Sequence, residues 1–218
     1  RRAAMIKAND IEMVKLGGMT PEERERYEKN KIEINKKVSS LIAEATKNAK
    51  LECCILCSKP CSSFCNSHSI PQFALKRIAE DGKVMLPLQD EILTIGKDTG
   101  VNKAGTFHII CRDCDSRTFQ LYEDPNAYNS KPTDQMLAQI ALKDVLLMIS
   151  KRNQEREQYK LVGEQAEFLK DFADEKIYLG DFDLRDYGED LEYARSSLDG
   201  RKSNRYYLCF YTVLDYVV

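Results

Sequence analysis

The chain has 218 residues, of which 43% are hydrophobic and 31% are charged, and its formal net charge is −2 at neutral pH. These values are typical of one or two globular domains, and the near-neutral charge excludes a surface that is basic throughout. No apolar run approaches the roughly 20 residues of a membrane span and no secretory signal is visible, so we expect a cytoplasmic protein without a membrane partner. The chain begins with Arg1 and ends on the apolar sequence YTVLDYVV, so we also expect it to be part of a longer protein.

Long helices are expected on both sides of the chain's centre. The segment TPEERERYEKNKIEINKKVSSLIAEATKNAK predicts a helix over residues 21–49. It opens with a capping threonine, a proline suited to the first helical position and Glu23. We interpret its lysine-rich face as solvated, with contact to DNA or to a partner as the alternative. A second long helix is predicted from Thr133 to about Gly163, and two shorter ones in EQAEFLKDFADEK and LRDYGEDLEYARSSL. The β-branched and aromatic residues of RYYLCFYTVLDYVV predict a C-terminal strand.

Residues 51–131 differ in character, because they are rich in Cys, Gly and Pro and contain only short apolar runs. We expect a turn and a short helix in SIPQFALKRIAEDGK, and short strands in KVMLPLQDEILTIG and TFHIIC. Another short helix is expected in DSRTFQLYED, before Pro125. The chain is thus divided into an N-terminal helical arm (1–50), a cysteine-rich domain (51–131) and a helical region that ends in a strand (132–218).

Eight cysteines are many for a chain without a secretion signal, and this favours metal binding over disulfides. Five lie between residues 53 and 65, two at 111 and 114, and one at 209. Two Cys-x-x-Cys pairs have the spacing with which two thiolates on a tight turn reach one zinc ion: Cys54 with Cys57, and Cys111 with Cys114. Together the pairs predict a structural zinc site with four cysteine ligands. A redox dithiol and a disulfide are the alternatives.

The neighbouring cysteines leave the choice of ligands open. Cys53 is an alternative to Cys54, although the spacing to Cys57 favours Cys54 because it matches the second pair. We interpret Cys61 and Cys65 as partly buried thiols, with a second metal site as the alternative.

The order of motifs around these cysteines resembles the zinc-knuckle HNH endonucleases, a ββα-metal, treble-clef-like superfamily. The first knuckle is followed by SHSIP, and a strand then leads into Cys-x-x-Cys-Asp and a short helix, over about residues 51–125. The stretch from FHIICRDCDSRTFQLYEDP to MLAQIALKDVLLMISKR also looks like a family of uncharacterised bacterial proteins with such a domain. The resemblance implies an α+β fold in which a zinc-stabilised ββα-metal core is framed by long helices, with the predicted strand at the C-terminal end.

Carried over position by position, the resemblance implies that His68 is the general base that activates water for attack on a phosphodiester. Histidine is the side chain best suited to accept a proton near neutral pH. Asp115 falls on a metal-ligand position, and Glu123 and His108 are further candidate ligands of a catalytic Mg²⁺ or Mn²⁺. The alternatives are that His68 shapes the knuckle loop and that His108 is a half-buried strand residue.

The sequence departs from the family pattern at two positions and in length. Ser67 stands where the family usually has an acidic or histidine ligand, and Thr106 stands where it commonly has the asparagine that orients the base. The stretch between His68 and Cys111 also contains an insertion of about residues 72–104.

The leading hypothesis is a metal-dependent endonuclease that acts on DNA in preference to RNA, and the resemblance suggests a context in bacterial restriction or phage defence. A latent enzyme held by a protein partner in a larger complex fits the same sequence. The alternative is a catalytically degenerate zinc-binding scaffold that binds nucleic acid or a partner protein. Ser67 and Thr106 favour the scaffold, whereas His68 and Asp115 favour the nuclease. A zinc-ribbon adaptor without a role on nucleic acid is a third reading.

Overall fold

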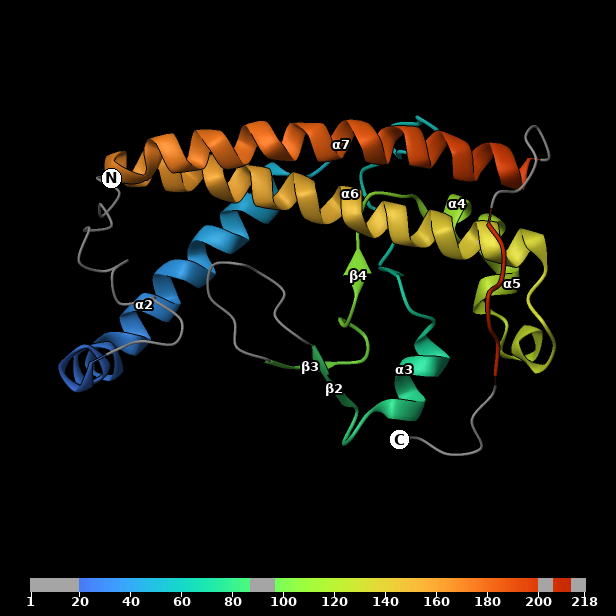
Figure 1. Ribbon diagram of the computed structural model, residues 1–218, viewed down its shortest axis with the longest axis horizontal. Coiled ribbons are helices and arrows are strands. Elements are labelled where there is room, and N and C mark those ends of the chain that lie inside the picture. Colours follow the sequence, from blue (N-terminus) through green and yellow to red (C-terminus); the bar gives the residue numbers. More distant parts are fainter. Residues whose placement is uncertain (1–19, 87–96, 200–205, 213–218) are drawn as a thin grey trace. The chain divides into compact units, whose positions relative to one another are not determined.

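The structure is a computed structural model, and it describes residues 20–86, 97–199 and 206–212. The fold is α+β and mainly helical, with two small antiparallel sheets of two strands each (Figure 1). The chain divides into two compact units: Arg1–Lys50 with Arg152–Asp183, and Leu51–Lys151 with Leu184–Val218. The predicted boundary after residue 50 lies between the units, whereas the boundary expected after residue 131 lies inside the second unit.

The long helices follow the sequence patterns closely. Helix α2 (Pro21–Asn48) confirms the helix predicted over residues 21–49. Helix α6 (Asp134–Gln165) confirms the second long helix, and the hydroxyl of Thr133 accepts a hydrogen bond of 3.3 Å from the N–H of Met136 at its first turn. A 3₁₀ turn, η3 (Glu167–Leu169), then leads into helix α7 (Lys170–Leu198).

Helix α7 is continuous, which corrects the prediction of two shorter helices in this region. The helix runs through Gly180, although a helical glycine costs up to about 1 kcal/mol relative to alanine. A Cβ at Gly180 would lie only 3.2 Å from Cδ of Arg152 on α6. The missing side chain therefore leaves room for this arginine, whose guanidinium forms an ion pair of 2.9 Å with Asp183 on α7.

The predicted C-terminal strand is wrong for the part of the segment that the structure describes. Residues 206–212 have no regular secondary structure, and the rest of that prediction lies outside the described residues. The ring of Tyr206 packs edge-on against Tyr193 at 5.7 Å, and the hydroxyl of Tyr211 donates to the carbonyl of Tyr128. Tyr206 and Tyr211 are thus used in side-chain contacts within the second unit, whereas Tyr207 and Phe210 are exposed.

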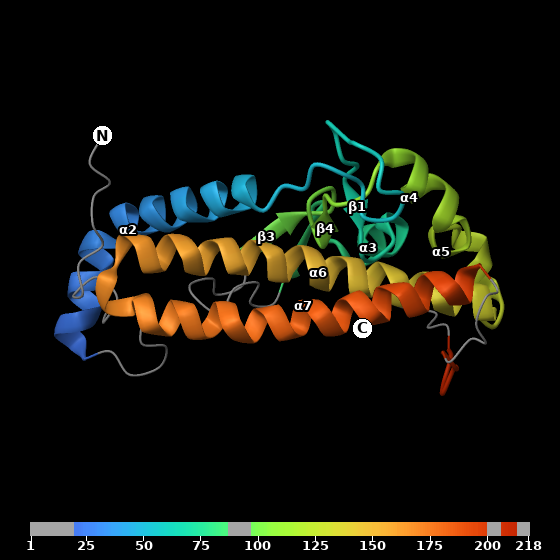
Figure 2. The same cartoon turned by 90° about the horizontal axis from the view of Figure 1, so that it is seen from above.

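The second unit contains both sheets. Strand β1 (Ser67–His68) pairs antiparallel with β4 (Thr106–Phe107), which is shorter than the strand predicted in TFHIIC. Helix α4 (Arg112–Thr118) follows β4, and the three elements lie together in Figure 2. The short helix predicted in DSRTFQLYED is divided at Phe119 into α4 and α5 (Gln120–Glu123), and the 3₁₀ turn η2 (Pro125–Asn129) follows.

The insertion between β1 and β4 forms a small substructure of its own. It consists of α3 (Gln72–Ile78), β2 (Lys83–Leu86) and β3 (Lys97–Gly100), and β2 pairs antiparallel with β3. A minor apolar cluster holds it together: Leu75, Val84 and Ala104. Residues 87–96, which include most of the strand predicted in KVMLPLQDEILTIG, lie outside the described residues.

One hydrophobic core joins the cysteine-rich region to parts of α6 and α7 within the second unit. Its buried members are Cys54, Phe107, Ile109, Ile110, Cys114, Phe119, Tyr122, Leu142, Leu146, Ile149, Leu191 and Ala194. The knuckles thus share one core with parts of both helices.

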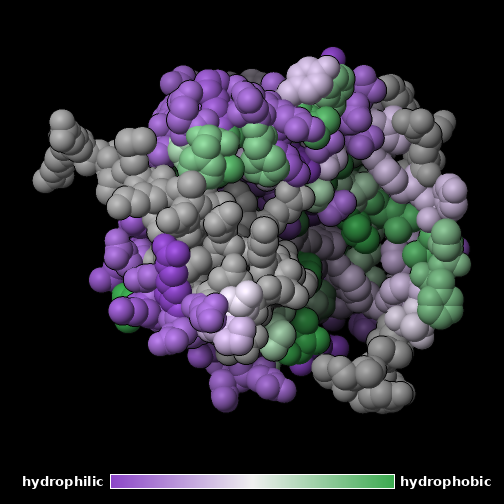
Figure 3. Space-filling view, turned by 60° about the vertical axis from the view of Figure 1, so that its left-hand side comes forward, coloured by the Kyte–Doolittle hydropathy of each residue, from purple (hydrophilic) through white to green (hydrophobic). Residues whose placement is uncertain are grey.

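The surface carries both polar and apolar side chains. On the face shown in Figure 3, hydrophilic residues are abundant and hydrophobic ones form separate groups. Large exposed apolar residues occur on α7 in the first unit, including Phe172, Tyr178, Leu179 and Phe182. None of the helices that the structure describes combines the length and the apolarity needed to cross a membrane.

Candidate functional site

The four cysteines predicted as zinc ligands come together. The Sγ atoms of Cys54, Cys57, Cys111 and Cys114 all lie within 4.8 Å of one another. Around a tetrahedral zinc with Zn–S bonds of about 2.3 Å, neighbouring sulfurs are roughly 3.8 Å apart. The Sγ atoms of Cys57 and Cys111 are 3.9 Å apart. This four-cysteine cluster therefore fits a metal ion such as zinc.

Backbone hydrogen bonds fix the two knuckles to each other. The first knuckle closes on a bond of 2.8 Å from the N–H of Ser58 to the carbonyl of Cys54, with Ser58 in the left-handed region at φ 57°. The N–H of Ile55 donates to the carbonyl of Ile109 at 3.0 Å, just before the second knuckle. The N–H of Cys111 donates to Sγ of Cys54 at 3.3 Å, a contact that stabilises a thiolate. The geometry of the cluster is thus set by the chain itself.

The shifted pKa values of Cys54 and Cys114 show why a bound cation would stabilise the cluster. Burial raises the pKa of the Cys54 thiol, but hydrogen bonds from the backbone at Cys111, Cys57 and Leu56 outweigh it and lower this pKa to about 7. Burial and the neighbouring sulfurs raise the pKa of Cys114. One thiolate therefore opposes the ionisation of another. A divalent metal removes the conflict, because metals bind the thiolate form and release its proton.

The remaining cysteines near the knuckles lie outside the cluster. Cys53 is exposed, whereas Cys54 is 1% exposed with its sulfur in the cluster, so the structure favours Cys54 as the ligand. The thiol of Cys61 donates to the carbonyl of Ser63 at 3.1 Å. Burial and the nearby negative charge of Asp115 raise the pKa of Cys65 to about 12. Within the part of the chain that the structure describes, these thiols form no second metal cluster.

His68 lies on β1, where it is opposite Thr106 on β4. Its Nε2 is 3.1 Å from the carbonyl oxygen of Val101, which belongs to the insertion. A carbonyl can only accept a hydrogen bond, so this contact assigns a hydrogen to Nε2, and in the neutral ring Nδ1 then carries the lone pair. Val101 of the insertion thus orients the imidazole.

The two strands approach closely beside His68 because residue 105 is a glycine. Gly105 has φ +61°, and a Cβ there would lie 2.8 Å from Oγ of Ser69. Its carbonyl accepts a hydrogen bond of 2.9 Å from the N–H of Ser69. Tyr122 on α5 donates through its hydroxyl to the carbonyl of Ser69, so α5 is attached to the end of β1.

Lys143 on α6 is the site residue that the sequence analysis missed. Its side chain is fully buried, and Nζ lies 2.6 Å from Oγ of Ser67, 2.9 Å from Oδ1 of Asp115 and 2.9 Å from Oε1 of Glu123. An ammonium group has three donors, and these three oxygens use all of them. The available signal was a charged residue within the apolar sequence IALKDVLLMIS of the second predicted long helix.

The surroundings of Lys143 strengthen its ion pairs. Nζ lies 4.1 Å from the ring centroid of Phe119 and 5.8 Å from that of Phe107, and both rings are fully buried. A cation over an aromatic face is stabilised by the ring, and opposite charges attract more strongly where water is excluded. The hydroxyl of Ser67 also donates to Oδ1 of Asp115 at 2.6 Å. We call Ser67, Asp115, Glu123 and Lys143 the lysine cluster.

The candidate residues of the catalytic site are thus only partly brought together. Ser67, Asp115 and Glu123 meet, but around Lys143 rather than around a free space. His108 is exposed, and among the described residues it forms no group of three close ligand atoms with acidic side chains. The structure does not assemble His108, Asp115 and Glu123 into a shared metal site.

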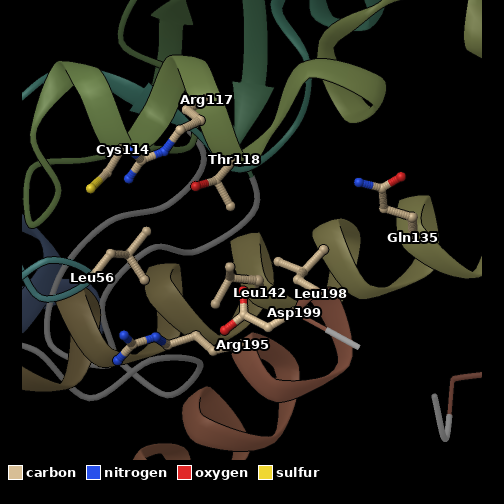
Figure 4. Close-up of a pocket in the computed structure, with 9 residues that line it drawn as sticks. All are labelled: Leu56, Cys114, Arg117, Thr118, Gln135, Leu142, Arg195, Leu198 and Asp199. Atoms are coloured by element: carbon tan, nitrogen blue, oxygen red, sulfur yellow. The ribbon is translucent and has the colours of Figure 1, made fainter. Parts of the chain in front are cut away.

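A pocket of about 360 Å³ lies next to the knuckles, but it is separate from His68 and from the lysine cluster. Figure 4 shows Cys114, Arg117 and Thr118 of α4 on one side of it and Arg195 of α7 on the other. None of the residues that line it belongs to the lysine cluster. Arg195 is also engaged by Glu192 at 2.9 Å.

Comparisons of the chain with protein-family models, with curated proteins and with solved structures found no match.

Proposed function

We propose that the chain is an endonuclease of the zinc-knuckle HNH type that hydrolyses nucleic acid, DNA foremost, with His68 as its general base. The observation that carries the proposal is the contact of 2.6 Å between Ser67 and Asp115. One is the residue before the candidate base and the other is the residue after the second knuckle. The resemblance implies that these two positions face the same catalytic centre, although they lie far apart in the sequence.

Two further features support the same plan. The order of strand β1, strand β4 and helix α4 beside the four-cysteine cluster is the order that a ββα-metal core requires. The bond from Nε2 of His68 to Val101 leaves Nδ1 as the proton acceptor. In the proposed reaction, Nδ1 takes the proton of a water molecule while the water oxygen attacks phosphorus and the bond to the leaving oxygen breaks.

The fit of a catalytic metal is the weak point of the resemblance. Carboxylates such as those of Asp115 and Glu123 are suitable ligands for Mg²⁺ or Mn²⁺. Here, however, each carboxylate is bound to the ammonium of Lys143 at 2.9 Å. A divalent ion does not fit between them while the lysine is in place, so the metal dependence expected from the family conflicts with this arrangement.

Cleavage assays test the proposal. The purified, zinc-loaded protein is incubated with plasmid DNA, single-stranded DNA and RNA, in separate reactions with Mg²⁺, Mn²⁺ and Ni²⁺. We expect cleavage that falls at least about 100-fold in His68→Ala, the lower end of general-base effects. His108→Ala is the matched control, because it removes the other, exposed histidine, and it should retain activity.

The outcomes separate the two parts of the proposal. Equal rates for the wild type and His68→Ala would remove His68 as the base, even if the protein is a nuclease. Absence of cleavage with every substrate and metal would overturn the endonuclease itself.

A second candidate function is a catalytically degenerate zinc-binding scaffold that binds nucleic acid or a partner protein. The observation that favours it is Lys143, whose three donors are all occupied and whose side chain is fully buried, so it offers no contact to a phosphate. For this candidate we expect that labelled duplex DNA binds without being cut, with an affinity that falls as salt rises. Anisotropy titrations at several salt concentrations, combined with the cleavage assay, distinguish it from the nuclease.

A further inference from the structure

We infer that Lys143 is the resident cation of a site that would otherwise bind a divalent metal, so that the lysine and a metal exclude each other. The inference rests on the proposed function only for the correspondence of residue positions. It holds whether or not the protein cleaves nucleic acid.

The first step concerns charge. Asp115 and Glu123 lie on α4 and α5, and both direct an oxygen to the same point, the Nζ atom of Lys143. Two carboxylates at such a distance from one point repel each other unless a cation lies between them. Lys143 on α6 supplies that cation, and its side chain is fully buried. The hydroxyl of Ser67 supplies a third oxygen, which lies 2.6 Å from Nζ.

The second step concerns size. Three oxygens lie 2.6–2.9 Å from the position of Nζ. Calcium takes oxygen ligands at about 2.3–2.6 Å and magnesium at about 2.1 Å. Shifts of less than about 1 Å would thus convert the oxygens around the ammonium into the ligands of a divalent ion. The same oxygens cannot serve both cations, because the ammonium occupies the position where an ion would sit.

The third step concerns access. The side chain of Asp115 is 18% exposed and that of Glu123 is 41% exposed, so the carboxylates reach solvent although Lys143 does not. An ion entering from that side would keep water as its remaining ligands, as Mg²⁺ and Mn²⁺ commonly do. The buried rings of Phe107 and Phe119, whose centroids lie 5.8 Å and 4.1 Å from Nζ, offer no ligand atom to an ion.

A pair of substitutions at one position tests the inference. Lys143→Ala removes the ammonium and opens its space, whereas Lys143→Met removes the charge but fills the space. Binding of Mn²⁺ to zinc-saturated protein is followed by electron paramagnetic resonance and by thermal unfolding. We expect Lys143→Ala to bind one Mn²⁺ at least tenfold more tightly than the wild type or Lys143→Met does, and to gain in Tm only when Mn²⁺ is added.

The location of the ion is tested by a triple variant. Lys143→Ala combined with Asp115→Asn and Glu123→Gln should lose the added Mn²⁺ binding and the gain in Tm. If Lys143→Ala folds neither with nor without Mn²⁺, Lys143→Ser, which also removes the charge and leaves the position of Nζ open, replaces it with the same expected result.

Two results would overturn the inference. One is a folded Lys143→Ala variant, or its replacement Lys143→Ser, that retains its zinc and binds Mn²⁺ no better than the wild type. The other is a wild-type protein that already binds Mn²⁺ at this place and loses it in Asp115→Asn, because lysine and metal would then coexist. Neither readout depends on cleavage, so failure of the nuclease proposal leaves the test intact.

Discussion

Cys114 and Asp115 are adjacent residues of α4, but they belong to two different clusters of acidic side chains. The two clusters differ in how their negative charge is balanced. The sulfur of Cys114 lies among three other cysteine sulfurs, and burial together with these neighbours raises the pKa of Cys114, so that a bound metal ion favours its thiolate form. The carboxylate of Asp115 lies beside Glu123, and the chain balances both with Lys143. A set of metal-ligating residues therefore indicates a metal only where the chain supplies no cation of its own, and a local motif does not reveal which case applies.

The largest expected effect comes from breaking the four-cysteine cluster. We expect one zinc per chain in the wild type, and loss of both zinc and cooperative folding of the second unit in Cys111→Ser combined with Cys114→Ser. Structural zinc sites contribute about 10–16 kcal/mol of apparent binding energy in small zinc domains, so the core around the knuckles should not form without the ion. Metal analysis and circular dichroism during urea unfolding measure both losses.

The matched control for this experiment is Cys61→Ser. Its thiol bonds to the carbonyl of Ser63 outside the cluster, so the variant should keep its zinc and its unfolding transition. A double variant at Cys111 and Cys114 that unfolded like the wild type would show that the cluster does not carry the fold.

In the lysine cluster, the largest effect is expected from Asp115→Asn. This change leaves a fully buried ammonium with one carboxylate, and breaking a buried ion pair in this way typically costs about 3–5 kcal/mol. Glu123→Gln should cost less, because its side chain is 41% exposed and water can replace part of the interaction. Urea unfolding of the zinc-saturated proteins gives the ranking.

Asp113→Asn is the control for these substitutions. Asp113 lies on the same short helix as Asp115 but is exposed. The free energy of unfolding of this variant should therefore differ from that of the wild type by less than about 0.5 kcal/mol. If Glu123→Gln proved more costly than Asp115→Asn, burial would not be what gives the ion pairs their strength.

A smaller effect is expected where β1 and β4 meet beside His68. Gly105→Ala places a side chain at φ +61° and brings its Cβ to 2.8 Å from Oγ of Ser69, so we expect a loss of about 1–3 kcal/mol in unfolding free energy. Gly188→Ala is the matched control, because nothing lies within 4 Å of its Cβ and the residue is helical. That control should be neutral or stabilising by up to about 1 kcal/mol. Equal effects of the two changes would contradict a close approach at Gly105.

The parts of this structure that local sequence determines were predictable. The spacing of Cys54 to Cys57 and of Cys111 to Cys114 is typical of knuckle turns, so the sequence predicted which four sulfurs come together. The limits of α2 and α6 follow from capping residues and from apolar periodicity, which act over a few neighbouring residues. The meeting of Ser67 with Asp115 was implied only through the resemblance to a known family.

The features that depend on distant residues were not predictable. Lys143 follows Asp115 by 28 positions, and only the packing of α6 brings its ammonium to the carboxylates. The continuity of α7 at Gly180 depends on Arg152, and the conformation of residues 206–212 depends on contacts such as that of Tyr206 with Tyr193. Helix and strand propensities describe single residues and their near neighbours, so they carry no information about these contacts. Tertiary packing overrides such propensities.

The smallest expected effect concerns Cys65, which lies close to the lysine cluster. We expect its thiol to react more slowly in the folded protein than in the unfolded one. Burial and the charge of Asp115 raise its pKa from 9.0 to about 12, so at pH 8.5 its thiolate fraction should be roughly a thousandfold lower in the folded than in the unfolded protein. Since the folded pKa is the higher one, Cys65 favours folding below pH 9 and this contribution declines as the pH rises from 9 towards 12. Iodoacetamide labelling followed by mass spectrometry of the Cys65 peptide, with and without urea, measures the difference. Labelling at the same rate in both conditions would mean that the negative charge of Asp115 and the burial around it do not act on this thiol, and the lysine cluster would then be more open to water than its contacts indicate.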